Sequence, residues 1–183
     1  NAIVYPTWYS GRHWDNEWLI GEGMALDPAK YFIIVPNMLG NGLSTSPSNT
    51  PPPYDQARFP NVTVYDNVAV QHRLVSERFG IETLKLVTGW SMGAGQTYQW
   101  AVSYPDMVQR ALPFCGSSKT SEHNVVFLEG VKSALTADAI NEVGVDVSLS
   151  HKYHLHNITD QELTYNIEDF ARHLAAHFVD TYP

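Results

Sequence analysis

The residues best suited to chemistry in this chain lie in one short stretch, Gly89-Trp90-Ser91-Met92-Gly93. The apolar run Leu84–Thr88 before it predicts a strand, and Ser91–Ser103 predicts a helix. A serine on a sharp strand-to-helix turn projects its Oγ above the sheet edge, and the flanking glycines let strand and helix approach closely. The stretch therefore predicts a nucleophilic serine, Ser91, in the setting that a G-x-S-x-G motif requires.

Two backbone amides are the expected partners of Ser91 in acyl chemistry. The oxyanion of a tetrahedral intermediate is stabilised by N–H donors that are already in place. The N–H of Met92, directly after the serine, is one candidate. A second donor is expected from the loop after the first strand, where Tyr9 or Trp8 is the candidate and Tyr9 is the one we select. The alternative is that these aromatic residues only pack or line a pocket.

The elements that must position these residues alternate along the chain. Apolar and β-branched runs predict strands at Ala2–Tyr5, Tyr31–Pro36, Leu84–Thr88 and Ala111–Cys115. Helical periodicity predicts helices at Asp66–Phe79, Ser91–Ser103, Asn124–Leu135 and Thr159–Val179. Strands alternating with helices indicate right-handed crossovers. The predicted fold class is α/β, a three-layer αβα sandwich around a mostly parallel sheet.

Some of these segments carry more detailed expectations. Tyr31–Pro36 is continuous enough in apolar residues to be buried on both faces. Asp66 is the expected N-cap of its helix, whose repeating apolar positions are Val70, Leu74, Val75 and Phe79. The segment Asn37–Pro60 is rich in Gly, Ser, Pro and Asn and predicts a long loop without a regular element. We expect a core over residues 1–140 and a divergent tail over residues 141–183 that ends in an amphipathic helix.

Several separate motifs, in one order, resemble the homoserine O-acetyltransferase branch of the α/β-hydrolases over about Ala2 to Ala139. Besides the motif around Ser91, the matching stretches are Trp8–Gly11, Trp18–Gly21, Ala25–Asp27 with Tyr31-Phe32, Pro36–Gly42 with Ser44–Ser46, Phe59-Pro60, Thr63, Tyr65–Val68, Gln96, Tyr104-Pro105, Ser117–Ser121 and His123-Asn124. The resemblance implies an α/β-hydrolase fold and a ping-pong mechanism.

In that mechanism Ser91 would take an acyl group from a donor such as acetyl-CoA and pass it to a hydroxyl acceptor. Acyl-CoA would then be a co-substrate, with no bound cofactor, and water as the acceptor would make the protein a hydrolase. Trp90 and Ala94 stand where homoserine O-acetyltransferases usually carry glycine. A bulky Trp90 beside the serine would reshape the acyl pocket, so a relative with another substrate is an equal alternative.

Ser91 also needs a histidine as base and a carboxylate to orient it, and both follow the serine along the chain in this fold. The candidates are Asp146 or Asp160 with His151, His154, His156, His173 or His177. Two further strands fit poorly between Ala139 and the helix at Thr159. The alternative is a truncated hydrolase without a complete triad, or a non-catalytic module for binding or homodimerisation.

Other reactive side chains support weaker hypotheses. His151, His154 and His156 form an H-x-x-H-x-H cluster, but no nearby cysteine completes a zinc site, so we expect a solvated segment and no metal. The pair His173 and His177 lacks the glutamate of a zinc-binding H-E-x-x-H motif. Cys115 ends the fourth predicted strand, and the default expectation for it is a buried, inert thiol.

Composition narrows the class of partner. The net charge is −8 and no cluster of Lys or Arg occurs, which argues against a nucleic acid. No apolar run approaches the roughly 18 residues that span a bilayer, so we expect no membrane partner. A single cysteine in 183 residues favours a reducing, cytoplasmic location. Because a strand-like run follows Asn1 at once, we expect further sequence before it.

Overall fold

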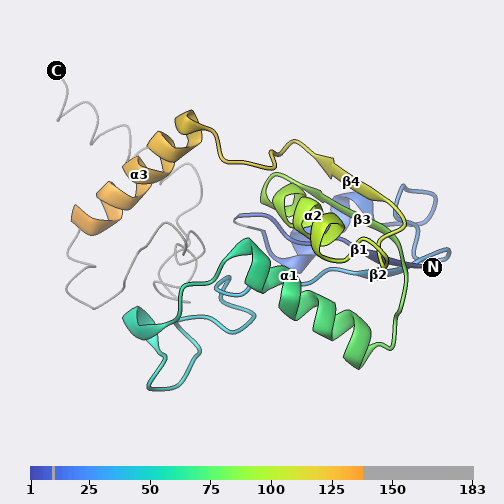
Figure 1. Ribbon diagram of the computed structural model, residues 1–183, viewed down its shortest axis with the longest axis horizontal. Helices are drawn as coiled ribbons and strands as arrows, with labels where there is room; N and C mark the ends of the chain where they lie inside the picture. Colours follow the sequence, from blue (N-terminus) through green and yellow to red (C-terminus); the bar gives the residue numbers. More distant parts are fainter. Residues whose placement is uncertain (10, 138–183) are drawn as a thin grey trace.

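The structure, a computed structural model, describes residues 1–9 and 11–137 (Figure 1). It shows a parallel four-stranded sheet in the order β2-β1-β3-β4, formed by β1 (Ala2–Val4), β2 (Phe32–Ile34), β3 (Leu84–Trp90) and β4 (Ala111–Phe114). All three strand pairs are parallel, which confirms the predicted α/β class. The tail over 141–183, the helix at Thr159–Val179 and the histidine clusters lie outside the described residues.

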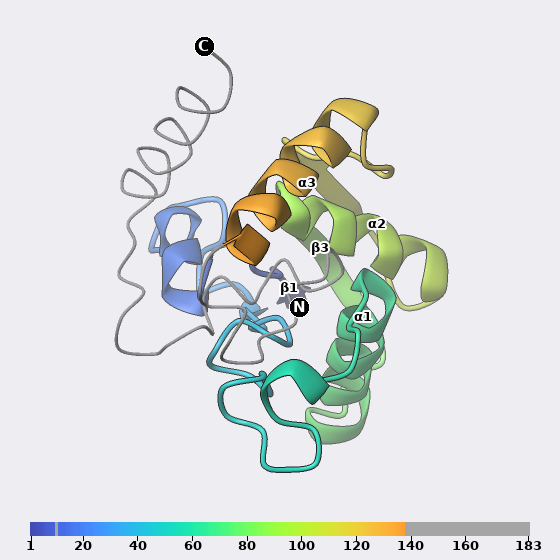
Figure 2. The same ribbon diagram turned by 90° about the vertical axis from the view of Figure 1, so that its left-hand side faces the viewer.

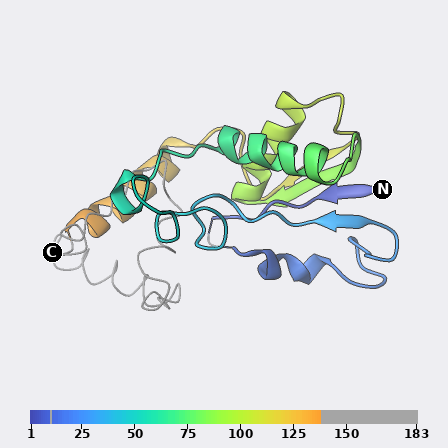
Figure 3. The same cartoon turned by 90° about the horizontal axis from the view of Figure 1, so that it is seen from below.

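The helices of the described chain are α1 (Val64–Arg73), α2 (Met92–Ser103) and α3 (Glu122–Ala137), with a π-helical turn η3 (Leu74–Arg78) after α1 and two 3-10 helices, η1 (His13–Leu19) and η2 (Gln56–Arg58). Seen from below the first view, α1 and α2 lie on one side of the strands and η1 on the other (Figure 3). From the α3 end, α3 stands in front of α2 and β3 (Figure 2). No helix in this part of the chain has the length and apolar character needed to cross a bilayer.

Alternating side chains of β1 bury an apolar cluster on each face of the sheet. Ala2 and Val4 pack with α1 and α2 residues such as Val68 and Trp100. Ile3 and Tyr5 pack on the opposite face, where Leu26 and the end of η1 cover them. This alternation follows from the two-residue period of a strand, which sends successive side chains to opposite faces.

Two strand predictions need correction. β2 is not buried on both faces, because it lies at one edge of the described sheet and Phe32 is 55% exposed. β3 continues past Thr88 to Trp90, since β4 pairs with it as far as Phe114. The long loop over Asn37–Pro60 is present, although it contains the short helix η2 near its end.

The start and the buried face of α1 also differ from the prediction. The N-cap is Thr63, whose hydroxyl accepts from the N–H of Asp66, while the Asp66 carboxylate accepts from the N–H of Thr63. Asp66 is therefore the third residue of the helix and the acidic member of a capping box. Among the predicted apolar positions Val75 is buried, but Val70 is 49% exposed. The buried face of α1 instead carries Asn67, Val68 and Gln71.

Loss of the Thr63 cap gives a first testable prediction. The substitution Thr63→Ala removes the acceptor for the Asp66 N–H and is expected to lower the free energy of unfolding by about 1 kcal/mol. Urea denaturation measures this effect. The exposed Thr45 is the matched control, because Thr45→Ala should change stability by less than about 0.5 kcal/mol. Equal effects of the two substitutions would contradict the capping role.

Candidate functional site

The turn that carries Ser91 joins two elements without an intervening loop. β3 ends at Trp90 and α2 begins at Met92, so Ser91 is the only residue between them. Its backbone is left-handed, with φ 53° and ψ −120°. The Ser91 N–H donates to the Phe114 carbonyl at 3.1 Å, and the Ser91 carbonyl accepts from the Ala94 N–H at 3.1 Å. A strained serine held in this way is typical of functional sites, and the structure has the strand-turn-helix arrangement that the motif predicts.

Glycines are required around Ser91 because the backbone of the β3–α2 turn approaches the segments that follow β1 and β4 closely. A Cβ on Gly89 would stand 2.4 Å from the carbonyl oxygen of Gly93. A Cβ on Gly93 would stand 2.7 Å from the carbonyl oxygen of Pro6. Pro6 lies between the end of β1 and the predicted oxyanion loop. Gly116 was not singled out from the sequence, but it tolerates a side chain no better. A Cβ added to Gly116 would lie 2.5 Å from the Ser91 carbonyl oxygen.

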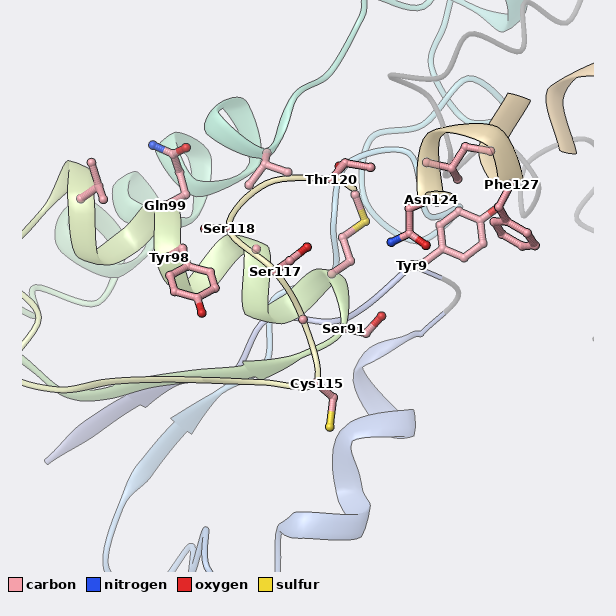
Figure 4. A pocket seen from close by; sticks show the side chains of 16 residues that line it. Tyr9, Ser91, Tyr98, Gln99, Cys115, Ser117, Ser118, Thr120, Asn124 and Phe127 are labelled. Atoms are coloured by element: carbon pink, nitrogen blue, oxygen red, sulfur yellow. The ribbon is translucent and has the colours of Figure 1, made fainter. Parts of the chain in front are cut away.

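Ser91, Met92 and Tyr9, the three site residues predicted from the sequence, line one cavity of about 580 Å³. Figure 4 shows Tyr9 and Ser91 in this cavity beside residues that come from other elements. The rest of the wall is built from α2, from the start of α1 at Val64, from the loop after β4 and from α3, with residues that include Tyr98, Gln99, Ser117, Ser118, Thr120, Asn124 and Phe127. The topology thus brings the carboxyl ends of β1, β3 and β4 to one hollow, where open α/β sheets bind ligands.

Trp8, the other candidate for the oxyanion loop, does not belong to the described wall of this cavity. Its ring packs against that of Trp90, with 4.8 Å between centroids and 55° between planes. It also lies against Gly11, whose added Cβ would meet the Trp8 ring at 2.7 Å. Trp90 is likewise missing from the described wall. The bulky residue before the serine therefore packs against Trp8 beside the cavity.

The phenol of Tyr9 is in a poorly solvated position. Burial raises its pKa to about 12, because the charged phenolate would lose its hydration. The hydroxyl is therefore neutral throughout the neutral pH range and cannot serve as the base for Ser91. Any part that Tyr9 plays in acyl chemistry falls to its backbone N–H or to its neutral hydroxyl.

The expectation that Cys115 is buried is wrong. β4 ends one residue earlier, at Phe114, and the chain then turns through a left-handed residue with φ 51° at Cys115. This turn takes the side chain past the edge of the sheet, where it is exposed and lines the same cavity as Ser91 (Figure 4). Apolar residues at the end of a strand do not show in the sequence whether the last one points into the core or into a cleft.

The base and the acid for Ser91 are not found in the described part of the cavity wall, which contains no histidine and no carboxylate. The candidates from the sequence, His151 to His177 with Asp146 or Asp160, lie outside residues 1–137. Within those residues no group of three or more His, Cys, Asp or Glu side chains is arranged to hold a metal ion.

A buried chain of hydrogen bonds behind the site escaped sequence reasoning. The indole N–H of Trp100 donates to Gln71 Oε1 at 2.9 Å, and Gln71 Nε2 donates to Gln96 Oε1 at 2.6 Å. Gln96 Nε2 then donates to the Thr7 carbonyl at 2.8 Å. Glutamine inside a helix is usually a surface residue, so the helical pattern alone does not separate these two from exposed glutamines.

Comparison with known proteins relates this chain to a protein family. The model of a protein family described as "alpha/beta hydrolase fold" matches residues 9–136. An ethyl acetate hydrolase of Pseudomonas veronii is 52% identical over 146 residues, which cover 79% of this chain and 42% of that protein. A homoserine O-acetyltransferase of Methanohalobium evestigatum is 39% identical over 137 residues, covering 72% of this chain and 28% of that protein.

A solved structure supports the same grouping. The acetyl esterase MekB superimposes with a TM-score of 0.75 at 43% sequence identity, and the match covers all of this chain and 56% of that chain. The chain thus spans about half the length, or less, of the relatives that it matches. The esterases are more similar to it than the homoserine O-acetyltransferase is, which agrees with the departures at Trp90 and Ala94.

Proposed function

The chain belongs to the α/β-hydrolase family, and we therefore propose that it hydrolyses small acyl esters through an acyl-enzyme formed on Ser91. The observation that carries this proposal is the left-handed turn that places Ser91 in one cavity with Met92 and Tyr9. A nucleophile and two amide donors around one hollow are what a tetrahedral oxyanion intermediate needs.

The chemistry proceeds in two steps. In the first, Ser91 Oγ attacks the ester carbonyl, its proton passes to a base, and the N–H groups of Met92 and Tyr9 hold the developing oxyanion. Collapse breaks the ester C–O bond, and the alcohol leaves with that proton. In the second step water attacks the acyl-enzyme, releasing the carboxylic acid and restoring Ser91. The described wall of the cavity contains no histidine that could serve as this base.

Water is the proposed acceptor because the esterases resemble this chain more strongly than the acyltransferase does. The ethyl acetate hydrolase and the acetyl esterase are both named for acetyl ester substrates. Acyl transfer to a hydroxyl acceptor is the second candidate, which the similarity to a homoserine O-acetyltransferase favours. Both functions use the same acyl-enzyme and differ in what attacks it.

Labelling with a fluorophosphonate, followed by peptide mapping, tests the nucleophile. We expect one adduct per chain, on Ser91, together with release of acetic acid from ethyl acetate. Adding L-homoserine or a simple alcohol shows where the acyl group goes, because a transferase yields the acyl product and a hydrolase yields acetic acid. Heat-denatured protein is the control for non-specific labelling.

A folded chain that takes up no label and releases no acid would contradict the proposal. That result would favour the alternative of a non-catalytic module, in which Ser91 has the elbow geometry but no base to activate it. An adduct on Cys115, which lines the same cavity, would move the nucleophile to the thiol and contradict the assignment to Ser91.

A further inference from the structure

The two buried glutamines connect the interior of the helical layer to the loop that carries Tyr9. Gln96, Trp100 and Thr7 are fully buried, and Gln71 is 4% exposed. These polar groups are far from solvent, so each unsatisfied donor or acceptor would be costly. Their hydrogen bonds run without a gap from α2 to α1, back to α2 and then to the Thr7 carbonyl.

The first and last groups of this hydrogen-bond series determine the orientation of both glutamine amides. The Trp100 indole can only donate, so the oxygen of Gln71 must face it. The nitrogen of Gln71 then faces Gln96, whose oxygen accepts. The remaining Gln96 nitrogen faces the Thr7 carbonyl, which can only accept. Only this order of donors and acceptors gives each of these groups a hydrogen-bond partner. The Gln96 side chain therefore keeps its N–H donor directed at the loop and cannot flip its amide.

Thr7 is held from two sides. Its carbonyl accepts from Gln96 at 2.8 Å, and its hydroxyl donates to the Pro36 carbonyl at 3.3 Å. The next carbonyl along the chain, that of Trp8, accepts from the Gly11 N–H at 3.1 Å. In a trans peptide the C=O and the following N–H point in opposite directions. The Trp8 carbonyl therefore determines the direction of the Tyr9 N–H, and Gln96 anchors the residue just before that turn.

We propose that Gln96 is a positioning residue for the oxyanion site. Through the Thr7 carbonyl, Gln96 holds the Tyr9 N–H in register with Ser91. Because that carbonyl can only accept, it keeps the Gln96 nitrogen facing the loop whether or not Gln71 is present. This inference rests on the proposed function, because it assigns a role to the Tyr9 amide. Gln96 itself touches neither substrate nor Ser91, and it does not belong to the described wall of the cavity.

Gln71 provides a matched control for Gln96. The substitution Gln96→Leu removes two hydrogen bonds of the chain, those to Gln71 and to Thr7. The substitution Gln71→Leu also removes two, those to Trp100 and to Gln96, but it leaves the Gln96 donor available to Thr7. A merely structural role predicts equal effects of the two substitutions on melting temperature and on activity.

The test measures kcat and KM for ethyl acetate hydrolysis, together with the melting temperature, in the full chain. We expect Gln96→Leu to lower kcat about 10- to 100-fold, somewhat less than the outright loss of an oxyanion donor. KM should stay within about twofold, because the cavity wall is unchanged. Gln71→Leu should lower the melting temperature about as much as Gln96→Leu does. It should lower kcat by less than about threefold. Equal losses of kcat in the two variants would overturn the proposal.

A second variant and a second readout keep the test decisive. If Gln96→Leu does not fold, Gln96→Met keeps the length of the side chain but cannot donate to Thr7, and it should lower kcat in the same way. Amide hydrogen exchange of the Tyr9 N–H should be faster in the Gln96 variants than in Gln71→Leu. Because exchange needs no turnover, an inactive wild-type chain would refute the proposed function, whereas unchanged Tyr9 exchange would refute the positioning role.

Discussion

We expect replacement of Ser91 with glycine to abolish the proposed ester hydrolysis and at the same time to make the folded chain more stable. Ser91 has φ 53°, a backbone conformation that costs a residue with a side chain about 1–3 kcal/mol and glycine very little. Glycine loses part of this gain through the greater freedom of the unfolded chain. The net expected increase in the free energy of unfolding is about 1 kcal/mol, with hydrolysis lowered about 10⁶-fold, to background.

Alanine at the same position separates the two effects. Ser91→Ala also removes the hydroxyl and should be equally inactive, but its Cβ keeps the left-handed backbone unfavourable, so no stabilisation is expected. Chemical denaturation and ethyl acetate hydrolysis of the three proteins give the comparison. Residual turnover in either variant would mean that another group is the nucleophile. Stabilisation by alanine as large as that by glycine would mean that the turn is not strained.

Replacing Gly89 with alanine will disrupt the turn. The added Cβ would lie 2.4 Å from the Gly93 carbonyl oxygen and 2.5 Å from its carbonyl carbon. These are backbone atoms in the first turn of α2, so no side chain can rotate away, and β3 and α2 must separate. We expect a loss of about 3 kcal/mol or more in the free energy of unfolding, within the range for overpacked cores, and loss of hydrolysis in the protein that still folds.

Gly95 on the same helix is the matched control for stability. A Cβ on Gly95 meets no atom within 4 Å beyond its chain neighbours and the backbone of its own helix, and alanine is the better helix former by about 1 kcal/mol. Gly95→Ala should therefore be neutral or stabilising in a thermal or urea melt. If Gly89→Ala were as stable as Gly95→Ala, the close approach of β3 and α2 would not be a real constraint on the motif.

Much of the site was predictable because its causes are local. An apolar run followed by Gly-Trp-Ser-Met-Gly and a helical segment specifies a strand, a tight turn and a helix, whatever lies around them. The parallel order of strands follows from their alternation with helices, since a parallel pair needs a crossover. The carboxyl ends of such strands meet at one edge, which is why Ser91 and the loop carrying Tyr9 were expected together.

Tertiary packing decided the features that sequence patterns missed. The buried face of α1 includes Asn67 and Gln71, because hydrogen bonds with Leu39, Gln96 and Trp100 compensate for their burial. The side chain of Cys115 reaches the cavity because its own turn is left-handed. In each case the environment of a residue depends on partners far along the chain. A local pattern determines what a segment can form, and the distant contacts determine which of its faces is buried.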